Sequence, residues 1–282
     1  MRCYLQSLLC AALLVITNYC FAQSTFVVVA ANMKDAFTEI NNQFQKEHKA
    51  DLKVIYGSSG NFASQIIHGA PFHLFISADE QYPLELFKKG KTVDEGKIYA
   101  IGKLALITNQ AKGMSPNESK DDLAGLIKRA NKIALAKPEL APYGKASVEY
   151  LKASHLWDLA KDKIVYADNI AMAAMFVSTG SADIGFTALS IATSPTIQKE
   201  IKFITLNPNL YQPIKQRMVL VKNPTKDAVK LFEFMQSPIA KEILKRHGYA
   251  LPWVTNIHTS RPSSLELGEL TQPKLVYRKT YY

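Results

Sequence analysis

Residues 25–44 read TFVVVAANMKDAFTEINNQF, and this stretch decides the fold class. Its first six residues are mostly β-branched or aromatic, which is typical of a buried strand. From residue 33 to residue 44 the apolar side chains recur at three- and four-residue spacing, which predicts a helix. Asn32 lies between the two elements and is the expected N-cap of that helix. The stretch is therefore a strand that runs directly into a helix.

The same alternation of strand and helix continues along the 282-residue chain. It predicts an α/β fold with parallel sheets and helices on both faces. Further strands are expected at 52–56, 74–77, 103–108, 132–136, 163–166, 184–186, 203–204 and 217–221. Further helices are expected at 62–67, 83–89, 121–129, 145–153, 170–177, 226–236 and 238–247.

The N-terminus predicts export. Arg2 precedes the apolar run LLCAALLVI at residues 8–16, and Ala22 closes a small-residue cleavage site. The run is too short to span a membrane, which takes about 20 apolar residues, but it fits a signal peptide. A buried core element is the alternative. We expect a cleaved signal peptide over residues 1–22 and a mature protein in a bacterial periplasm.

The cysteines agree with export. All three, Cys3, Cys10 and Cys20, lie before the expected cleavage site. The mature chain then has no disulfide and no thiol chemistry. Cys20 as a lipid-bearing first residue is the alternative, although the polar and bulky residues 17–19 before it are unusual in a lipoprotein signal.

The charge balance points to anions. Lys and Arg number 34 against 24 Asp and Glu, which makes the formal net charge +10. Such a balance suits small anions, nucleic acid or a membrane surface. The basic residues are scattered and not clustered among aromatic residues, so we expect no nucleic-acid partner.

Motifs for catalysis are missing. The histidines have no metal-ligand spacing, residues 57–60 (GSSG) are not a nucleophile elbow, and no phosphate-binding glycine motif occurs. We therefore expect no metal, no cofactor and no enzymatic activity. An exported hydrolase that uses Asp79 or Glu80 is the alternative, but this pair is better explained as the cap of a helix near Pro83.

Four expected turns before helices combine small or hydroxyl residues with backbone amides: residues 31–33, 58–60, 142–144 and 169–171. The first N–H groups of a helix have no acceptor within it, and the helix dipole is positive at that end. Such helix starts bind anions and gather at the carboxyl edge of an open sheet. The turns together predict an anion site.

Longer motifs carry a resemblance to a known family. The chain resembles the molybdate-binding proteins of bacterial ABC transporters, which are class II periplasmic binding proteins. The matching motifs are AANMKDAF (30–37), YGSSGNFASQIIHGAPFHLFISADE (56–80), AIGKLALIT (100–108), ALAKPELAPYGKAS (134–147), ADNIAMA (167–173), ADIGFTALS (182–190) and HGYALPW (247–253).

The resemblance implies two lobes, each a mainly parallel sheet flanked by helices, with the ligand cleft between them. The first lobe would comprise residues 23–103 and 217–253, and the second residues 104–216. Residues 254–282 lie outside the resemblance and are expected to form an extended or disordered tail.

The resemblance also implies a ligand set without charged groups. Asn32 would offer its backbone amide, Ser59 its hydroxyl and amide, and Tyr143 and Ile170 their backbone amides. Molybdate has no proton at neutral pH and only accepts hydrogen bonds, so a set without a carboxylate favours molybdate, tungstate or sulfate over phosphate. We expect a monomer that captures molybdate or tungstate and delivers it to a membrane permease.

Three positions depart from the family pattern. One branch of the family carries a hydroxyl residue where this chain has Ala31, another carries Ser in place of Asn32, and many relatives carry a Tyr hydroxyl in place of Ala188. Ser58 is the neighbour that would supply a replacement hydroxyl, while Asp168 is expected to point away and cap its helix. The departures leave another ligand open, such as sulfate or an organic anion.

Overall fold

The computed structural model describes residues 24–117 and 119–252. The expected signal peptide (1–22) and the expected tail (254–282) lie outside the described residues. Within the described part of the chain, none of the helices combines the length and apolar character needed to cross a bilayer.

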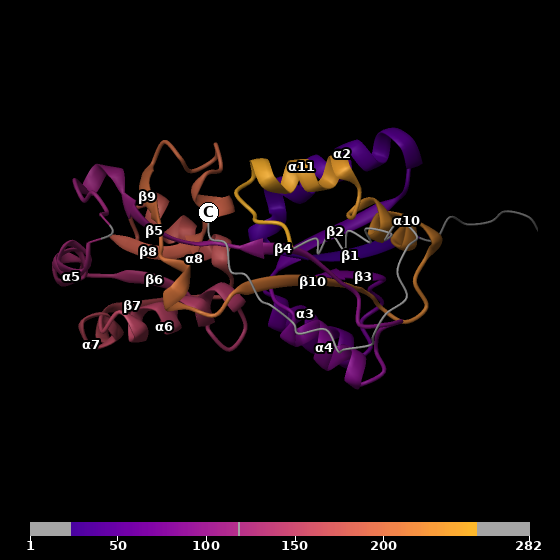
Figure 1. Ribbon diagram of the computed structural model, residues 1–282, viewed down its shortest axis with the longest axis horizontal. Helices are drawn as coiled ribbons and strands as arrows, with labels where there is room; N and C mark the ends of the chain where they lie inside the picture. The colour runs from indigo at the N-terminus through magenta and orange to yellow at the C-terminus, as the bar shows by residue number, and fades with distance from the viewer. Residues whose placement is uncertain (1–23, 118, 253–282) are drawn as a thin grey trace, which may run out of the picture. The chain divides into compact units, whose positions relative to one another are not determined.

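The first lobe is built on a five-stranded sheet in the order β2-β1-β3-β10-β4 (Figure 1). β1 pairs in parallel with β2 and β3, whereas β10 pairs antiparallel with β3 and β4. The strands are β1 (Thr25–Ala30), β2 (Leu52–Gly57), β3 (Leu74–Ile76), β4 (Lys97–Gly102) and β10 (Ile214–Leu220). The helices are α2 (Lys34–His48), α3 (Ser59–Ile67), α4 (Gln81–Lys88), α10 (Lys226–Phe234) and α11 (Pro238–Arg246).

β1 shows why this sheet needs helices on both faces. Val27 and Val29 pack with α2, α10 and α11, whereas Val28 packs with α3 and α4. All three valines are fully buried. Alternate side chains of a strand point to opposite faces, so an uninterrupted run of valine must be covered twice.

The second lobe is built on another five-stranded sheet, in the order β7-β6-β8-β5-β9. β6 pairs in parallel with β7 and β8, whereas β5 pairs antiparallel with β8 and β9. The strands are β5 (Leu104–Asn109), β6 (Ile133–Ala136), β7 (Ile164–Ala167), β8 (Ile184–Ala188) and β9 (Ile201–Thr205). The helices are α5 (Lys120–Arg129), α6 (Pro142–Ala153), α7 (Trp157–Ala160), α8 (Ile170–Ser178) and α9 (Leu189–Ala192). Short 3-10 turns are η2 (Ala31–Met33), η3 (Gln110–Lys112), η4 (Lys161–Lys163) and η5 (Pro208–Leu210).

The α/β two-lobe fold is confirmed, with one refinement. Each sheet is mixed, with two parallel and two antiparallel pairings, and is not mainly parallel as expected. The reason is the crossing of the chain between the sheets. β4 ends at Gly102 and β5 begins at Leu104, and the return leads from β9 into β10. β5 enters the second sheet directly from the first lobe, and β10 enters the first sheet directly from the second lobe. Neither is preceded by a crossover helix, so both are free to run antiparallel.

Two local expectations were wrong. The N-cap of α2 is Met33, not Asn32, because Asn32 lies within the 3-10 turn η2 that precedes the helix. β4 was not expected at all, although its sequence KIYAIG is mostly apolar and ends on glycine. The lobe boundaries at residues 103/104 and 216/217 stay a prediction.

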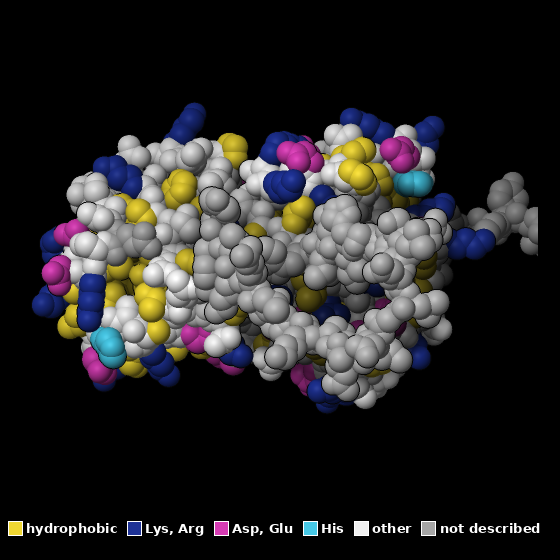
Figure 2. Space-filling model, in the orientation of Figure 1, with side chains coloured by type: hydrophobic (Ala, Val, Ile, Leu, Met, Phe, Trp, Pro, Cys, Tyr) yellow, Lys and Arg dark blue, Asp and Glu magenta, His cyan; other side chains and the backbone are white. Residues whose placement is uncertain are grey.

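The basic side chains do not gather into one patch on the face shown in Figure 2. They are interspersed there with acidic and uncoloured side chains. This distribution gives no support to a nucleic-acid interface.

Candidate functional site

A small cavity of about 10 Å³ lies between the two sheets, at the ends of strands and the starts of helices. The four residues predicted from the sequence, Asn32, Ser59, Tyr143 and Ile170, all line it. The full lining is Ala30, Ala31, Asn32, Gly57, Ser58, Ser59, Ala78, Ala141, Pro142, Tyr143 and Ile170. The fold thus brings the four predicted residues together, and their contact with a ligand stays a prediction.

The cavity is lined by neutral groups only. Of the described residues, no Asp, Glu, Lys, Arg or His belongs to the lining. Three helices begin there: Ser59 and Ile170 are the first residues of α3 and α8, and Tyr143 is the second of α6. Their first N–H groups and positive dipole ends face a space without counter-charge. This arrangement suits a small anion that only accepts hydrogen bonds.

One hydrogen bond orients the hydroxyl of Ser59. Its Oγ accepts a hydrogen bond from the amide of Ala78 at 3.0 Å, and the side chain is buried. A hydroxyl has one proton and two lone pairs, so accepting from Ala78 leaves the proton of Ser59 available to a ligand.

Ser58 is the N-cap of α3, but its hydroxyl does not cap the helix. Its buried Oγ has no hydrogen-bond partner among the described residues. The amide of Gly60, which an N-cap side chain would ordinarily accept from, donates instead to the Leu140 carbonyl of the second lobe at 2.9 Å. Gly60 is needed there, because an added Cβ would lie 2.9 Å from Leu140 Cα.

The backbone and the side chain of Tyr143 contact different parts of the structure. Its backbone lies at the start of α6, while its phenol accepts a hydrogen bond from Gln216 Nε2 at 2.9 Å. The phenol oxygen packs so closely over Gly102 that an added Cβ would be 2.0 Å away. Burial raises the pKa of Tyr143 well above its usual value, so the phenol is neutral.

The expectation that Asp168 caps the helix beginning at Ile170 was wrong. Asn169 caps α8, because its Oδ1 accepts from the Met172 amide at 3.0 Å. Asp168 points away from the cavity, as expected, but it pairs with Lys137 at 2.7 Å and does not cap the helix. Ala188 is buried and is not part of the cavity lining, whereas Ala31 is.

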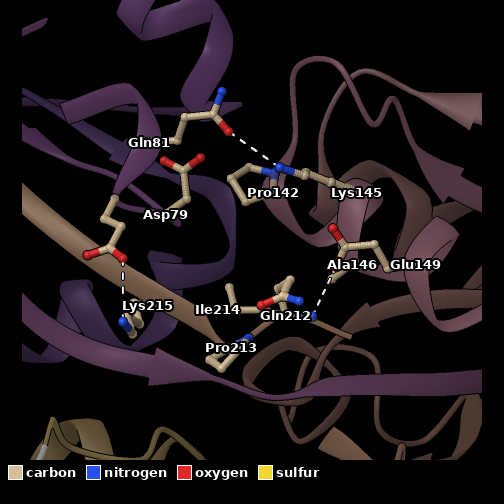
Figure 3. Close-up of a pocket in the computed structure, with 11 residues that line it drawn as sticks. Asp79, Gln81, Pro142, Lys145, Ala146, Glu149, Gln212, Pro213, Ile214 and Lys215 are labelled. Carbon is tan, nitrogen blue, oxygen red and sulfur yellow. Dashed lines mark hydrogen bonds and ion pairs between the residues drawn. The ribbon is translucent and has the colours of Figure 1, made fainter. Parts of the chain in front are cut away.

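Asp79 and Glu80 lie at a second cavity of about 120 Å³ between the lobes (Figure 3). Asp79 Oδ1 accepts from Ser77 Oγ at 3.0 Å and from the Tyr82 amide at 3.3 Å, near the start of α4. Burial raises the pKa of Asp79 to about 6, against the lowering by these hydrogen bonds. Glu80 pairs with Arg217 and Lys215. These contacts agree with a structural role for the pair.

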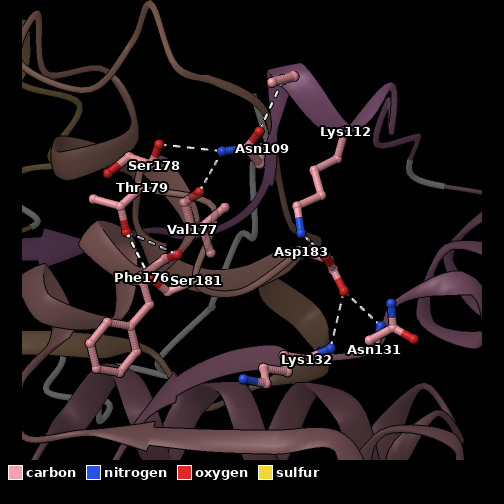
Figure 4. Close-up of polar contacts among 11 residues, drawn as sticks. Asn109, Lys112, Asn131, Lys132, Phe176, Val177, Ser178, Thr179, Ser181 and Asp183 are labelled. Carbon is pink, nitrogen blue, oxygen red and sulfur yellow. Dashed lines mark hydrogen bonds and ion pairs between the residues drawn. The ribbon is translucent and has the colours of Figure 1, made fainter.

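Asp183 is a further buried carboxylate and lies directly before β8 of the second sheet (Figure 4). It accepts from Lys112 Nζ at 2.7 Å and from the amides of Asn131 and Lys132 at 2.7 and 3.1 Å. Burial alone would raise the pKa of Asp183, but the hydrogen bonds from Lys112 and the two amides outweigh it, so the pKa is lowered. Asp183 therefore ties three loops of the second lobe together.

Sequence reasoning missed Gln216, whose side chain is fully buried and reaches both Asn32 and Tyr143. A signal was present. In β10 the residues Ile214, Gln216 and Met218 occupy alternate, inward positions, and Gln216 is the polar one. A polar side chain at an inward strand position must find buried partners.

A family model described as bacterial extracellular solute-binding protein matches residues 26–250. The molybdate-binding protein ModA of Azotobacter vinelandii is 36% identical over 245 residues, covering 82% of this chain and 92% of that protein. ModA of Rhodobacter capsulatus is 34% identical over 232 residues, covering 81% and 88%. The solved structure of the Azotobacter vinelandii periplasmic molybdate-binding protein matches with a TM-score of 0.69 at 32% identity, covering 82% of this chain and all of that one.

Asp79→Asn should stabilise the protein near neutral pH. The folded-state pKa of about 6 lies above the unfolded value near 3.9, so the folded state binds more protons and loses stability as pH rises between them. The amide keeps the acceptor for Ser77 and Tyr82 without the charge. We expect the variant to gain about 1–2 kcal/mol over wild type between pH 4 and pH 7, in chemical unfolding at each pH. A gain that does not change with pH would contradict this origin.

Asp183→Asn should change the stability of the protein in the opposite direction and destabilise it. Its lowered pKa contributes stability above the unfolded value, and that contribution is lost as pH falls. We expect a loss of about 1–3 kcal/mol at pH 7 in urea unfolding, which shrinks towards pH 3. Asp158→Asn is the matched control, because Asp158 forms an exposed ion pair with Lys161 and should change stability little. Equal losses for both variants would refute the special role of Asp183.

Proposed function

The chain belongs to the family of bacterial extracellular solute-binding proteins, and on that basis we propose that it is the molybdate-binding component of an ABC transporter. It captures the oxyanion between its two lobes and delivers it to the membrane permease, without covalent chemistry. The proposal extends to export to the periplasm, to a monomeric state and to tungstate as a second ligand.

One observation carries the proposal. The cavity where three helices begin has hydroxyl and amide donors but, in the described part of the chain, no charged side chain. Molybdate at neutral pH is a dianion with no proton to donate, so a carboxylate in the site would only repel it. Neutral donors also avoid the cost of burying an unpaired Lys or Arg when the cleft is empty.

The proposed ligand set follows from the lining. The first lobe offers the hydroxyl and amide of Ser59 and the amide of Asn32, and the second offers the amides of Tyr143 and Ile170. Ser58 adds a hydroxyl, since its buried Oγ otherwise lacks a partner. Each hydrogen bond to a charged acceptor contributes about 1.5–3 kcal/mol, so several of them support affinity from about micromolar to nanomolar.

The lobe division completes the proposal. In this proposal residues 24–103 with 214–252 and residues 104–213 form the two lobes that close on the ligand, because β10 pairs with the first sheet from Ile214 onwards and the expected boundary at 216/217 would divide it. The chain crosses between them at Lys103, between β4 and β5, and again before β10. With so few residues at each crossing, rigid-body closure about these segments is the natural motion.

A second candidate is the same fold tuned to another anion. Ala31 lines the cavity and has no hydroxyl group to donate, so the set of donors is smaller than a hydroxyl residue there would make it. Sulfate has the same charge as molybdate but shorter bonds to oxygen, and cavity size must separate the two.

Isothermal titration of residues 23–282 with molybdate, tungstate and sulfate tests the function. We expect one-to-one binding of molybdate and tungstate at micromolar affinity or better, with sulfate far weaker. Saturation by sulfate without binding of molybdate would replace the first candidate by the second.

Ser59→Ala and Ser58→Ala should each weaken molybdate binding by about 1–3 kcal/mol, because each removes one donor to a charged acceptor. Ser64→Ala is the matched control, since Ser64 lies on the exposed face of the same helix α3. Titration of the three variants separates the contributions. An unchanged dissociation constant for Ser59→Ala or for Ser58→Ala removes that residue from the ligand set.

A further inference from the structure

A chain of buried hydrogen bonds connects the proposed ligand turns of the two lobes. It begins at Asn32 in the first lobe and reaches Tyr143 and Ser190 in the second. We call it the bridging network, and its members are Asn32, Tyr99, Tyr143, Ser190, Gln216 and Tyr249. All six side chains are buried.

Gln216 spans the space between the two proposed ligand residues. Its Oε1 accepts from Asn32 Nδ2 at 3.0 Å, and its Nε2 donates to the Tyr143 phenol at 2.9 Å. Tyr99 fixes the carboxamide further, because its hydroxyl lies 2.8 Å from the same Oε1. One carboxamide thus joins a side chain of the first lobe to a side chain of the second.

Within the bridging network, Ser190 makes the second connection between the lobes. It belongs to α9, and its Oγ donates to the Asn32 carbonyl at 2.9 Å. Tyr249 lies 2.8 Å from that carbonyl and 2.9 Å from Ser190 Oγ, and it accepts from Asn32 Nδ2 at 2.9 Å. The main chain and side chain of Asn32 are both held by this group.

Separation of the lobes would break only part of the network. Asn32, Tyr99, Gln216 and Tyr249 belong with the first sheet, so their mutual bonds would persist. The bonds that would be lost are those from Ser190 to Asn32 and Tyr249, and that from Gln216 to Tyr143. Once exposed, these groups would be hydrated, so the open form carries no unpaired buried group.

We propose that Gln216 and Ser190 are positioning residues that latch the two lobes together around the bound anion. The latch rests on the proposed function, since it assigns the closed arrangement to the ligand-bound state. It holds the turn of Asn32 and the start of α6 where their amides meet the same ligand. Ligand binding and lobe closure are therefore coupled through hydrogen bonds between side chains that do not themselves contact the ligand.

The chemistry of the latch is neutral. Burial raises the pKa of Tyr249 and of Tyr143, and neither Gln216 nor Ser190 is ionisable at ordinary pH. The contribution of the latch should therefore be insensitive to moderate salt, unlike that of an ion pair.

Ser190→Ala and Tyr143→Phe test the latch, because each deletes one connection between the lobes and leaves the backbone amide of Tyr143 intact. Ser194→Ala is the matched control, since this buried serine follows α9 and its Oγ accepts from Thr196 within the same lobe. Titration and stopped-flow kinetics measure the affinity and the two rate constants for molybdate. Thermal unfolding of the ligand-free proteins separates a latch from general stability.

We expect each test variant to release molybdate about tenfold faster, with an association rate and ligand-free melting temperature close to wild type. The double variant should release it faster still, and Ser194→Ala should behave as wild type. Wild-type release rates in both test variants would overturn the latch. So would a loss of affinity matched by an equal loss of ligand-free stability, since that indicates a merely structural role.

Failure of the proposed function gives a different result. If wild-type protein binds neither molybdate nor tungstate nor sulfate, the proposed function is wrong, and the latch, which rests on it, is overturned with it. Binding by wild type together with wild-type release rates in both test variants overturns the latch alone.

Discussion

The meeting of three helix starts at one neutral cavity constrains the structure around it. A helix start provides N–H groups without charge, and three helices of this protein begin at the same small space. For α3 and α6 to approach from different lobes, backbone must pass close to backbone. Gly60 makes this possible, because its amide donates to Leu140 and its missing side chain leaves room for that residue.

The carboxylates Asp79 and Asp183 lie outside this cavity, where each has a structural role. Asp79 accepts from Ser77 and Tyr82 beside the second cavity, and Asp183 holds two amides and Lys112 at the far side of the second lobe. Burial raises the pKa of both carboxylates. For Asp183 the hydrogen bonds from Lys112 at 2.7 Å and from two amides outweigh burial, whereas for Asp79 burial prevails, so the two net pKa shifts are opposite.

The mixed sheets are what make two lobes from one chain. β5 and β10 are the strands that arrive from the other lobe, and both lie antiparallel to neighbours in their sheets. The crossing at Gly102 also passes directly beneath the phenol of Tyr143. The crossing between the sheets, the start of α6 and the network around Gln216 therefore meet in one buried region, which connects the crossing directly to the cavity.

The sequence by itself determined the local elements and the residues that line the site. The valine run of β1, the helical period of α2 and the small residues at the starts of α3, α6 and α8 are local patterns, and each acts through neighbours along the chain. It failed where local signals were ambiguous, at β4 and at the N-cap of α2, where a 3-10 turn intervenes. Only the tertiary structure decided the mixed pairing of the sheets, the lack of a partner for the Ser58 hydroxyl among residues 24–117 and 119–252, and the bridging role of Gln216. Gln216 and Tyr143 are 73 residues apart, and Ser190 and Asn32 are 158 apart, so their hydrogen bonds depend on how the two lobes meet and not on any local pattern.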